Sequence, residues 1–280
     1  MKFYKTNKHS NRILGRSLAI LGTALISWGI VISPSAAISN PAIAPAPKAY
    51  TPPRNPRTPR GPFIPAGRRT GCQGDLHSGL TAIAPQQQVG QTLSTRPTLT
   101  WYVASATPYD VQLQLYEYTN SQWVSLSDVE LGQNPPGYNS YTIPESAPLT
   151  VGGLYRWNIV MVCDPARPSR NRVDIADFEV VSPPADLNLS GDSPLTQAQQ
   201  YAAAGLWYDA ITLLTNTQLT GSQLTPDALS YRQTLLLNLA AVELPELAEQ
   251  LEFIAKQVHG PSANPLASPS ANPSANPSAE

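Results

Sequence analysis

The chain has 280 residues, 13% of them charged, and its formal net charge of −1 conceals a strong segregation of charge along the sequence. No Asp or Glu precedes Asp75, whereas eleven of the eighteen Lys and Arg residues do. From Asp75 onward seven cations face nineteen carboxylates, a net charge of −12. Such segregation is not typical of one globular domain. It indicates an exported protein with a basic leader and arm, and its acidic body argues against a nucleic-acid partner.

Residues 1–37 have the pattern of a secretory signal. Five cations precede the apolar run Leu18–Ile32, and the small residues Ser35, Ala36 and Ala37 form a cleavage motif. The run is about fifteen residues long, whereas a helix that spans a bilayer needs roughly twenty. We therefore expect export to the periplasm or the extracellular side of the envelope, with membrane contact only through this segment during export. An uncleaved N-terminal anchor is the alternative.

Export changes the interpretation of the two cysteines, Cys72 and Cys163. In an oxidising compartment an isolated even pair predicts one disulfide. Closing a loop of this length would stabilise the fold by roughly 4 kcal/mol in the entropic model. The alternative is a metal site that also uses Asp75 and His77, but this spacing matches no zinc template. The sequence thus predicts a disulfide, and no metal or cofactor.

Residues 38–71 hold nine prolines, a density that predicts a disordered linker largely in polyproline II conformation. Within it Arg54, Arg57 and Arg60 alternate with prolines at a spacing of three. Since polyproline II has three residues per turn and rises about 3.1 Å per residue, the three guanidiniums would line one edge roughly 9 Å apart. They are a candidate contact for an anionic polymer or membrane headgroups. The alternative is a solvated spacer without a partner.

Residues 72–182 alternate apolar and polar side chains in short runs that turn residues separate. This pattern predicts an antiparallel β-sandwich, with Trp101 and Trp157 in its core. The stretches Pro97–Trp101 and Gly153–Trp157 resemble strands of fibronectin type III and immunoglobulin-like domains. The expected fold class is therefore α+β and mostly β, with an immunoglobulin- or fibronectin-III-like sandwich.

Residues 193–259 change to helical periodicity and predict a small appendage packed on the sandwich. Its first helix pair is similar to a tetratricopeptide repeat, so we expect a tetratricopeptide-like helical appendage. Residues 260–280 repeat Pro-Ser-Ala-Asn with a period of four, which fits no regular helix, and they are expected to be disordered. The expected helices are Leu195–Ala204, Leu206–Gln218, Pro226–Ala241 and one that begins at Pro245.

The sequence contains no recognisable catalytic motif. A nucleophile needs a positioned base, and only His77 could serve, next to the predicted disulfide. The stretch Asp186–Asp192 matches part of a calcium loop, but Gln197 stands where the loop needs Glu, and a linker turn before a helix cap explains the same residues. We therefore expect a protein that is not an enzyme.

Tyr116 and Tyr118 are the candidate contact residues of the predicted sandwich. They have the opposite parity from the apolar residues Val111, Leu113 and Leu115, so they should face outward. Outward tyrosines can anchor a protein partner or stack on sugar rings, since they offer rigid area with a polar tip. The alternative is that the helical appendage covers them.

The cysteine pair and the block Gly205-Leu-Trp-Tyr-Asp-Ala210, together with Arg96–Val103 and Cys163–Pro165, resemble the cyanobacterial domain-of-unknown-function family numbered nine-two-eight. The resemblance covers roughly residues 60–251. It implies an exported cyanobacterial envelope protein and brings no assigned catalytic residue. We expect a protein-interaction or adaptor module whose partner is another envelope or secreted protein. The alternative is a carbohydrate-binding module for wall or sheath polysaccharide.

Overall fold

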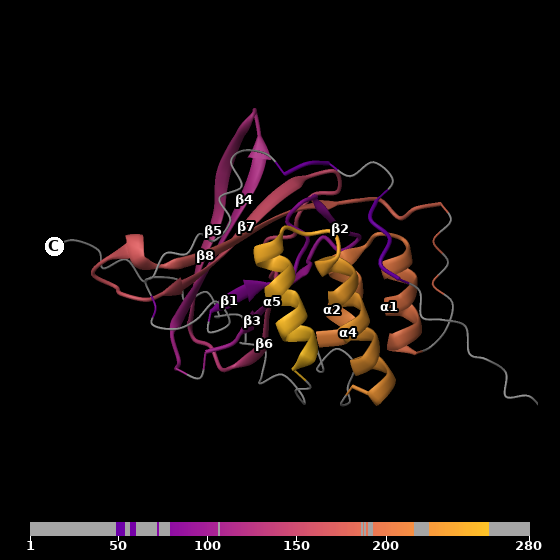
Figure 1. Cartoon of the computed structure of the whole chain (residues 1–280). Coiled ribbons are helices and arrows are strands. Elements are labelled where there is room, and N and C mark those ends of the chain that lie inside the picture. The colour runs from indigo at the N-terminus through magenta and orange to yellow at the C-terminus, as the bar shows by residue number, and fades with distance from the viewer. Residues whose placement is uncertain are drawn as a thin grey trace, which may run out of the picture. The chain divides into compact units, whose positions relative to one another are not determined.

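The computed structural model describes residues 49–53, 57–59, 79–105, 107–185, 193–215 and 224–257, together with the single residues 72, 187 and 189. All of them belong to one compact unit, Pro45–Glu280. The predicted signal segment and C-terminal tail lie outside the described residues, as do His77 and most of the calcium-like segment. Two β-sheets, four α-helices and one short 3₁₀ helix, Pro168–Arg170, make up the described part of the chain (Figure 1).

The smaller sheet has three antiparallel strands in the order β1-β3-β6. Its central strand alternates Leu99, Trp101 and Val103 with threonine and tyrosine, and all of its residues are buried. A strand that is buried on both faces must be covered on both, so this sheet forms the middle layer of the fold. Its strands are β1 (Leu80–Ala82), β3 (Thr98–Val103) and β6 (Gly137–Thr142).

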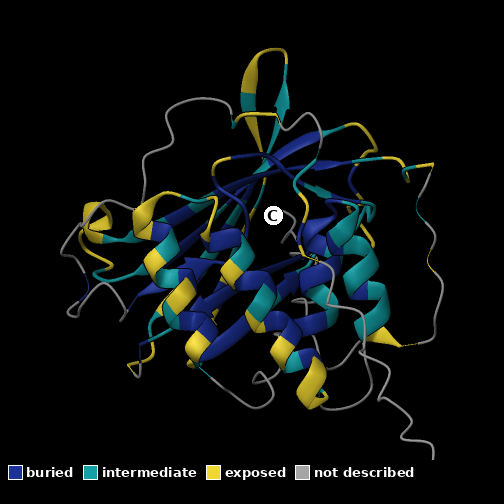
Figure 2. Ribbon diagram, turned by 45° about the vertical axis from the view of Figure 1, so that its right-hand side comes forward, coloured by how far each residue is buried: buried dark blue, intermediate teal, exposed yellow. Residues whose placement is uncertain are grey.

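The larger sheet has five strands in the order β2-β8-β7-β4-β5. β4 and β5 form a long hairpin whose tip projects beyond the other strands (Figure 2). Its turn residues, Asn120 and Ser121, have φ angles of 50° and 64°, as a two-residue turn of the primed type requires. The strands are β2 (Gly90–Thr92), β4 (Asp110–Thr119), β5 (Gln122–Gln133), β7 (Leu154–Val162) and β8 (Arg172–Val180).

The prediction of a purely antiparallel sandwich needs one correction, because β2 pairs in parallel with β8. The chain leaves the three-stranded sheet after Ala82 and then adds β2 to the edge of the five-stranded sheet. Pro85 lies between the two strands, where a residue that cannot donate to a ladder interrupts pairing. The N-terminal part of the sandwich is therefore divided between the two sheets.

The core between the sheets contains Trp101 of β3 and Trp157 of β7, both 0% exposed, as predicted. The indole Nε1 of Trp101 donates a hydrogen bond of 3.0 Å to Asn134 Oδ1, which itself lies in a buried residue. A buried donor without a partner costs free energy, so this bond removes the penalty of placing an indole in the core.

The helices form a third layer on the face of the three-stranded sheet that points away from this core (Figure 1). On that face the rings of Tyr102 and Tyr138 meet edge to face at 5.1 Å, and the guanidinium of Arg232 from α4 lies 4.2 Å over Tyr138. Thr81 of β1 donates a hydrogen bond of 2.8 Å to Gln250 of α5. The helices are α1 (Pro194–Ala203), α2 (Trp207–Thr215), α4 (Pro226–Ala240) and α5 (Pro245–Lys256).

These helices begin close to the residues at which the sequence predicts them. Thr225 caps α4, and its hydroxyl accepts a hydrogen bond of 3.2 Å from the backbone N–H of Ala228. The apolar stripe of α5 is buried at Leu247, Leu251 and Ile254, which face the rest of the helical layer and the sheet. Capping and periodicity thus set the limits of the helices, whereas the sheet sets their position.

Candidate functional site

The block Gly205–Ala210 lies where the helices meet the sandwich. Trp207 is fully buried, and its indole Nε1 donates a hydrogen bond of 2.8 Å to the carbonyl of Ile83, just after β1. Tyr208 is 1% exposed, and its hydroxyl accepts a hydrogen bond of 3.0 Å from the indole of Trp157. These two aromatic residues therefore tie α2 to both sheets.

Asp209, the charged residue of the same block, accepts a hydrogen bond of 3.0 Å from the backbone N–H of Leu93. Burial raises the pKa of its carboxyl to about 6. The block thus directs its indole, its phenol and its carboxyl to internal hydrogen bonds. Packing between the layers therefore explains the specific sequence of this block.

Part of the predicted linker lies on the folded body, at residues 49–53. Tyr50 is 6% exposed and packs edge to face against Trp207, with ring centroids 5.0 Å apart. Its hydroxyl accepts a hydrogen bond of 3.1 Å from Gln88 Nε2, and its backbone N–H donates one of 3.2 Å to Asn238 Oδ1. The structure differs here from the expected solvated linker, because an aromatic ring among the prolines supplies apolar surface worth burying.

Arg57, one of the three candidate contacts for an anionic polymer, also lies against the body. Its guanidinium is 3.3 Å from Glu179 Oε1 on β8, and its carbonyl accepts a hydrogen bond of 2.9 Å from Val89, just before β2. This part of the arm therefore runs along the β2 edge of the five-stranded sheet. Arg54 and Arg60 lie outside the described residues, so the predicted arginine edge stays a prediction.

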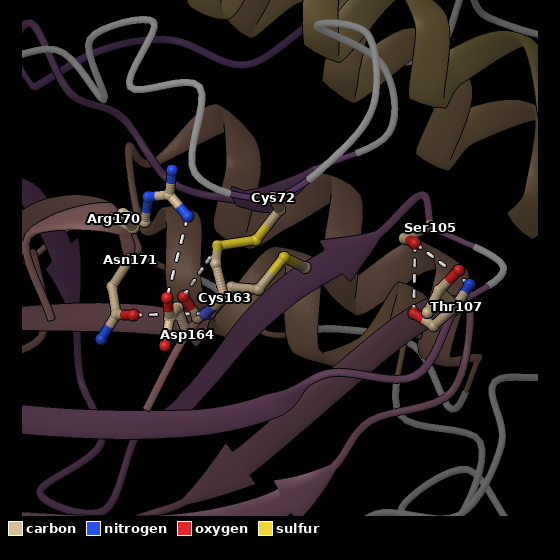
Figure 3. Close-up of a disulfide and its surroundings, with 8 residues drawn as sticks. Cys72, Ser105, Thr107, Cys163, Asp164, Arg170 and Asn171 are labelled. Carbon is tan, nitrogen blue, oxygen red and sulfur yellow. Dashed lines mark hydrogen bonds and ion pairs between the residues drawn. A yellow bond between two sulfur atoms is a disulfide. The ribbon is translucent and has the colours of Figure 1, made fainter. Parts of the chain in front are cut away.

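The predicted disulfide between Cys72 and Cys163 is present and joins residues that are 91 apart in the sequence (Figure 3). It links the segment before β1 to the end of β7. The backbone N–H of Cys163 donates a hydrogen bond of 3.2 Å to Asn171 Oδ1, and Asp164 lies 3.7 Å from the guanidinium of Arg170 (Figure 3). The bridge and these contacts order the connection from β7 to β8, so its role is structural.

Tyr116 and Tyr118 lie on the outer face of the five-stranded sheet, the face that points away from the core. Both side chains are partly exposed, whereas Val111, Leu113 and Leu115, which precede them on β4, are buried. The helices cover the outer face of the other sheet, and α2 contacts the five-stranded sheet at β2 and at the core residues Trp157 and Phe178 (Figure 1). The two tyrosines therefore point where the sequence predicts them to point, and the helical layer lies elsewhere.

Further side chains join the two tyrosines on this face. Across the β4–β5 ladder Tyr118 pairs with Trp123, and their rings are 5.1 Å apart and inclined by 65°. Arg156 of β7 places its guanidinium 4.4 Å from the centre of the Trp123 ring and donates hydrogen bonds of 2.6 and 3.0 Å to Asp177 of β8. We call Tyr116, Tyr118, Trp123 and Arg156 the outer aromatic cluster. The ion pair with Asp177 fixes the Arg156 guanidinium, and the guanidinium and the Tyr118 ring together fix the Trp123 ring.

Sequence reasoning placed Trp123 in a strand but did not assign it to the site. The missing information is the register of the β4–β5 pair, which follows from the turn at Asn120 and Ser121. A two-residue turn there makes Tyr118 and Trp123 direct cross-strand neighbours. The Asn-Ser dipeptide between two alternating runs is a signal that could have identified this pairing.

Two further carboxyl groups hold the segment between β1 and β2. Asp174 of β8 accepts hydrogen bonds of 2.7 Å from the backbone of Ala82 and 2.6 Å from Gln86 Nε2. Glu243, in the α4–α5 turn, accepts bonds of 3.0 Å from the backbones of Gln86 and Gln87. Burial raises the pKa of Asp174 to about 6 and that of Glu243 to about 7. The donors of both carboxyls lie in the segment that leads from β1 to β2, so the two carboxyls fix that segment.

A cavity of about 260 Å³ lies between α4 and α5 next to β6. Leu229, Leu236 and Ile254 contribute apolar walls, and Arg232 and Tyr138 line the same space. None of the described residues that line it is a carboxylate, histidine or cysteine. It therefore offers neither a general base nor a set of metal ligands from the described part of the chain.

The described residues provide little for chemistry that makes or breaks bonds. They include no histidine, and no three of their Cys, Asp and Glu residues gather so as to hold a metal ion. The described helices are also too short or too polar to cross a bilayer. What the described fold offers is a surface: a sheet face with partly exposed aromatic side chains.

This architecture, a disulfide-linked β-sandwich with a helical layer on one sheet, is accompanied by a family match. The family model described as Domain of Unknown Function (DUF928) matches residues 64–251, and the chain belongs to this family. A comparison with curated proteins found no match. The protein is similar to the solved structure of Astrotactin-2, a conserved vertebrate-specific and perforin-like membrane protein involved in neuronal development. The identity is 12% over 62% of this chain and 38% of that chain, and the TM-score of 0.24 supports no inference.

Proposed function

We propose that this protein is an exported, non-catalytic interaction module of the cell envelope that binds another envelope or secreted protein. The contact surface is the outer aromatic cluster. One observation carries the proposal: the two sheets differ in what covers their outer faces. The helices bury the outer face of the three-stranded sheet, whereas Tyr116, Tyr118 and Trp123 of the five-stranded sheet remain partly exposed. Clustered surface aromatics are typical anchors of protein interfaces.

The strand order supports an immunoglobulin-like architecture for this module. The orders β1-β3-β6 and β5-β4-β7-β8 correspond to A-B-E and C′-C-F-G of that fold, with β2 added beside the last strand. The helix pairs α1–α2 and α4–α5 are consecutive helical hairpins, which supports a tetratricopeptide-like appendage. In this scheme the appendage stabilises one side of the sandwich and leaves the other side for a partner.

Export is supported by two independent features. The first 37 residues have the pattern of a secretory signal. The disulfide between Cys72 and Cys163 would form and persist in an oxidising compartment such as the periplasm or the cell exterior. A module outside the cytoplasm and without visible catalytic chemistry fits a role in recognition or assembly.

The geometry of the rings favours a protein partner over a polysaccharide. Stacking on a sugar needs an open and flat ring face. Trp123 has the guanidinium of Arg156 over its ring, and Tyr118 meets it at 65° rather than in one plane. Tilted aromatic rings beside a fixed cation suit side chains of another protein better than a flat platform for sugar rings.

The test is cross-linking and affinity capture from the envelope with the full chain. The variant with Tyr118→Ala and Trp123→Ala should lose the captured protein while its thermal melt remains cooperative. The matched control carries Leu237→Ala and Val242→Ala, since these side chains are 40% and 49% exposed on the helical layer. Equal loss of the partner in the control, or retention on purified wall polysaccharide without a protein partner, would contradict the proposal.

A further inference from the structure

The outer face of the β4–β5 hairpin combines the aromatic cluster with carboxylates in a regular order along the strands. Resting on the proposed function, we propose that this face binds an extended segment of the partner that contains proline and arginine. The aromatic half of the face would receive the prolines, and an acidic half next to it would receive the arginines.

The aromatic half lies toward the tip of the hairpin. Tyr118 pairs with Trp123, and Tyr116 is opposite Ser125, so three rings occupy two successive outward rungs of the ladder. Proline-rich segments in polyproline II conformation bind to grooves lined by aromatic rings, because the ligand is already extended and loses little entropy. The rings of Tyr118 and Trp123 are inclined by 65°, so they offer such a segment two apolar surfaces that are not parallel.

The acidic half follows on the same face. Asp128 is opposite Gln114 and Glu130 is opposite Gln112, and each carboxylate accepts a hydrogen bond from the amide across from it, at 3.3 and 2.9 Å. Both carboxylates are exposed, and neither β4 nor β5 contains a lysine or arginine. The face therefore attracts cations and repels the anionic polymers considered for the arginine edge.

The dimensions agree with an extended ligand. From Tyr118 to Gln112 the outward side of β4 spans about 20 Å at a rise of roughly 3.3 Å per residue. A polyproline II segment rises about 3.1 Å per residue, so some six or seven residues cover this length. One segment can thus place prolines on the rings and an arginine at Asp128 or Glu130.

One arginine of the chain's own arm contacts the opposite edge of the same sheet. The stretch Arg57–Pro59 lies beside β2, with its Arg57 carbonyl bonded to Val89 and its guanidinium paired with Glu179. Glu179 alternates along β8 with core residues, so it belongs to the outer face. An arginine from the chain itself therefore pairs with a carboxylate at one edge of this face, and the β4–β5 edge offers the same charge with aromatic rings added.

The experiment titrates a fluorescent synthetic peptide with the sequence of residues 51–63 into the full-length protein and follows its polarisation. Trp123→Ala is expected to weaken binding about tenfold or more, the change that ~1.4 kcal/mol would produce. The pair Asp128→Asn and Glu130→Gln should weaken it similarly and reduce its salt dependence, because exposed charge contacts are screened over about 8 Å at physiological ionic strength. The matched control, Glu246→Gln with Glu249→Gln, removes the same charge from the exposed side of α5 and should bind as the wild type does.

Two peptide controls separate the contributions of the ligand. Replacing the arginines of the peptide by glutamine should abolish the salt dependence of its binding. Replacing the prolines by alanine should weaken binding, because the free peptide would no longer be held in an extended conformation. Glu179→Gln detects binding at the edge that Arg57 occupies. If this variant loses the peptide and the Asp128/Glu130 variant keeps it, the peptide has displaced the chain's own arm and the inference is overturned.

The outcome also separates this inference from the proposed function. If the peptide fails to bind while the Tyr118/Trp123 variant still loses its envelope partner, the proposed function stands. The partner then does not contact this face through a segment of proline and arginine, and this inference is wrong. If neither the peptide nor an envelope partner depends on this face, both proposals fail. Binding that requires both halves of the face supports them together.

Discussion

The hydroxyl of Tyr208 on α2 accepts a hydrogen bond of 3.0 Å from the indole Nε1 of Trp157, at the centre of the five-stranded sheet. The ring of Tyr208 also lies 5.2 Å from that of Phe178 on the neighbouring strand. Trp157 and Tyr208 are 0% and 1% exposed. A helix of the appendage thus completes the core of the sandwich, so the helices and sheets are expected to unfold as one unit.

The first prediction concerns this pair. Tyr208→Phe leaves the buried Trp157 donor without its partner, and it should lower the free energy of unfolding by about 1–3 kcal/mol. Urea unfolding followed by circular dichroism measures the change, and a single transition is expected in both proteins. The control is Tyr201→Phe on α1, a half-buried tyrosine whose hydroxyl has no hydrogen bond in the described part of the structure. Separate unfolding transitions for the helical and the strand signals in circular dichroism would show that the helices and the sheets do not unfold as one unit.

Much of this fold follows from local patterns in the sequence. Alternation gives β3, β4, β7 and β8, because apolar residues alternate with polar residues or tyrosine along most of each strand. Caps and breakers give the helices, as Thr225 before α4 illustrates. The disulfide follows from an isolated cysteine pair in a chain whose N-terminal pattern predicts export. These features depend on residues close in sequence or on simple pairing, and they were predictable for that reason.

The remaining features depend on contacts between distant residues. β2 is a Gly-Gln-Thr stretch without an apolar pattern, and only its place beside β8 makes it a strand. Tyr50 lies among prolines that predict a linker, and its burial needs a site formed by Trp207 and Asn238, more than a hundred residues later. Trp123 joins the candidate site through cross-strand register. No local pattern encodes the first two contacts, and only the turn at Asn120 and Ser121 points to the third.

The second prediction concerns the docked arm. Tyr50→Ala removes a buried ring from its contact with Trp207 and should cost about 3 kcal/mol or more, whereas Tyr50→Phe removes only the hydroxyl and should cost about 1 kcal/mol. Chemical denaturation monitored by tryptophan fluorescence measures both variants. Arg57→Gln serves as the control within the arm, since the Arg57 side chain is 56% exposed and its loss should cost less than the loss of the buried Tyr50 ring. Wild-type stability of Tyr50→Ala would mean that residues 49–53 do not dock in solution.

The last prediction is a dependence of stability on pH that comes from buried carboxyl groups. Burial raises the pKa of Asp174 from 3.8 to about 6, that of Asp209 from 3.8 to about 6, and that of Glu243 from 4.5 to about 7. Between the unfolded and folded values the native state binds more protons than the unfolded chain, so these groups favour folding below pH 4 and lose that contribution as the pH rises through 6 and 7. The melting temperature should therefore be higher near pH 5.5 than near pH 8.

Glu243→Gln should flatten this profile, because the amide does not titrate, while the exposed Glu246→Gln on α5 should leave it unchanged. A melting temperature that rises from pH 5.5 to 8, or a profile of Glu243→Gln that matches the wild type, would show that these carboxyls remain ionised at little cost in the folded protein.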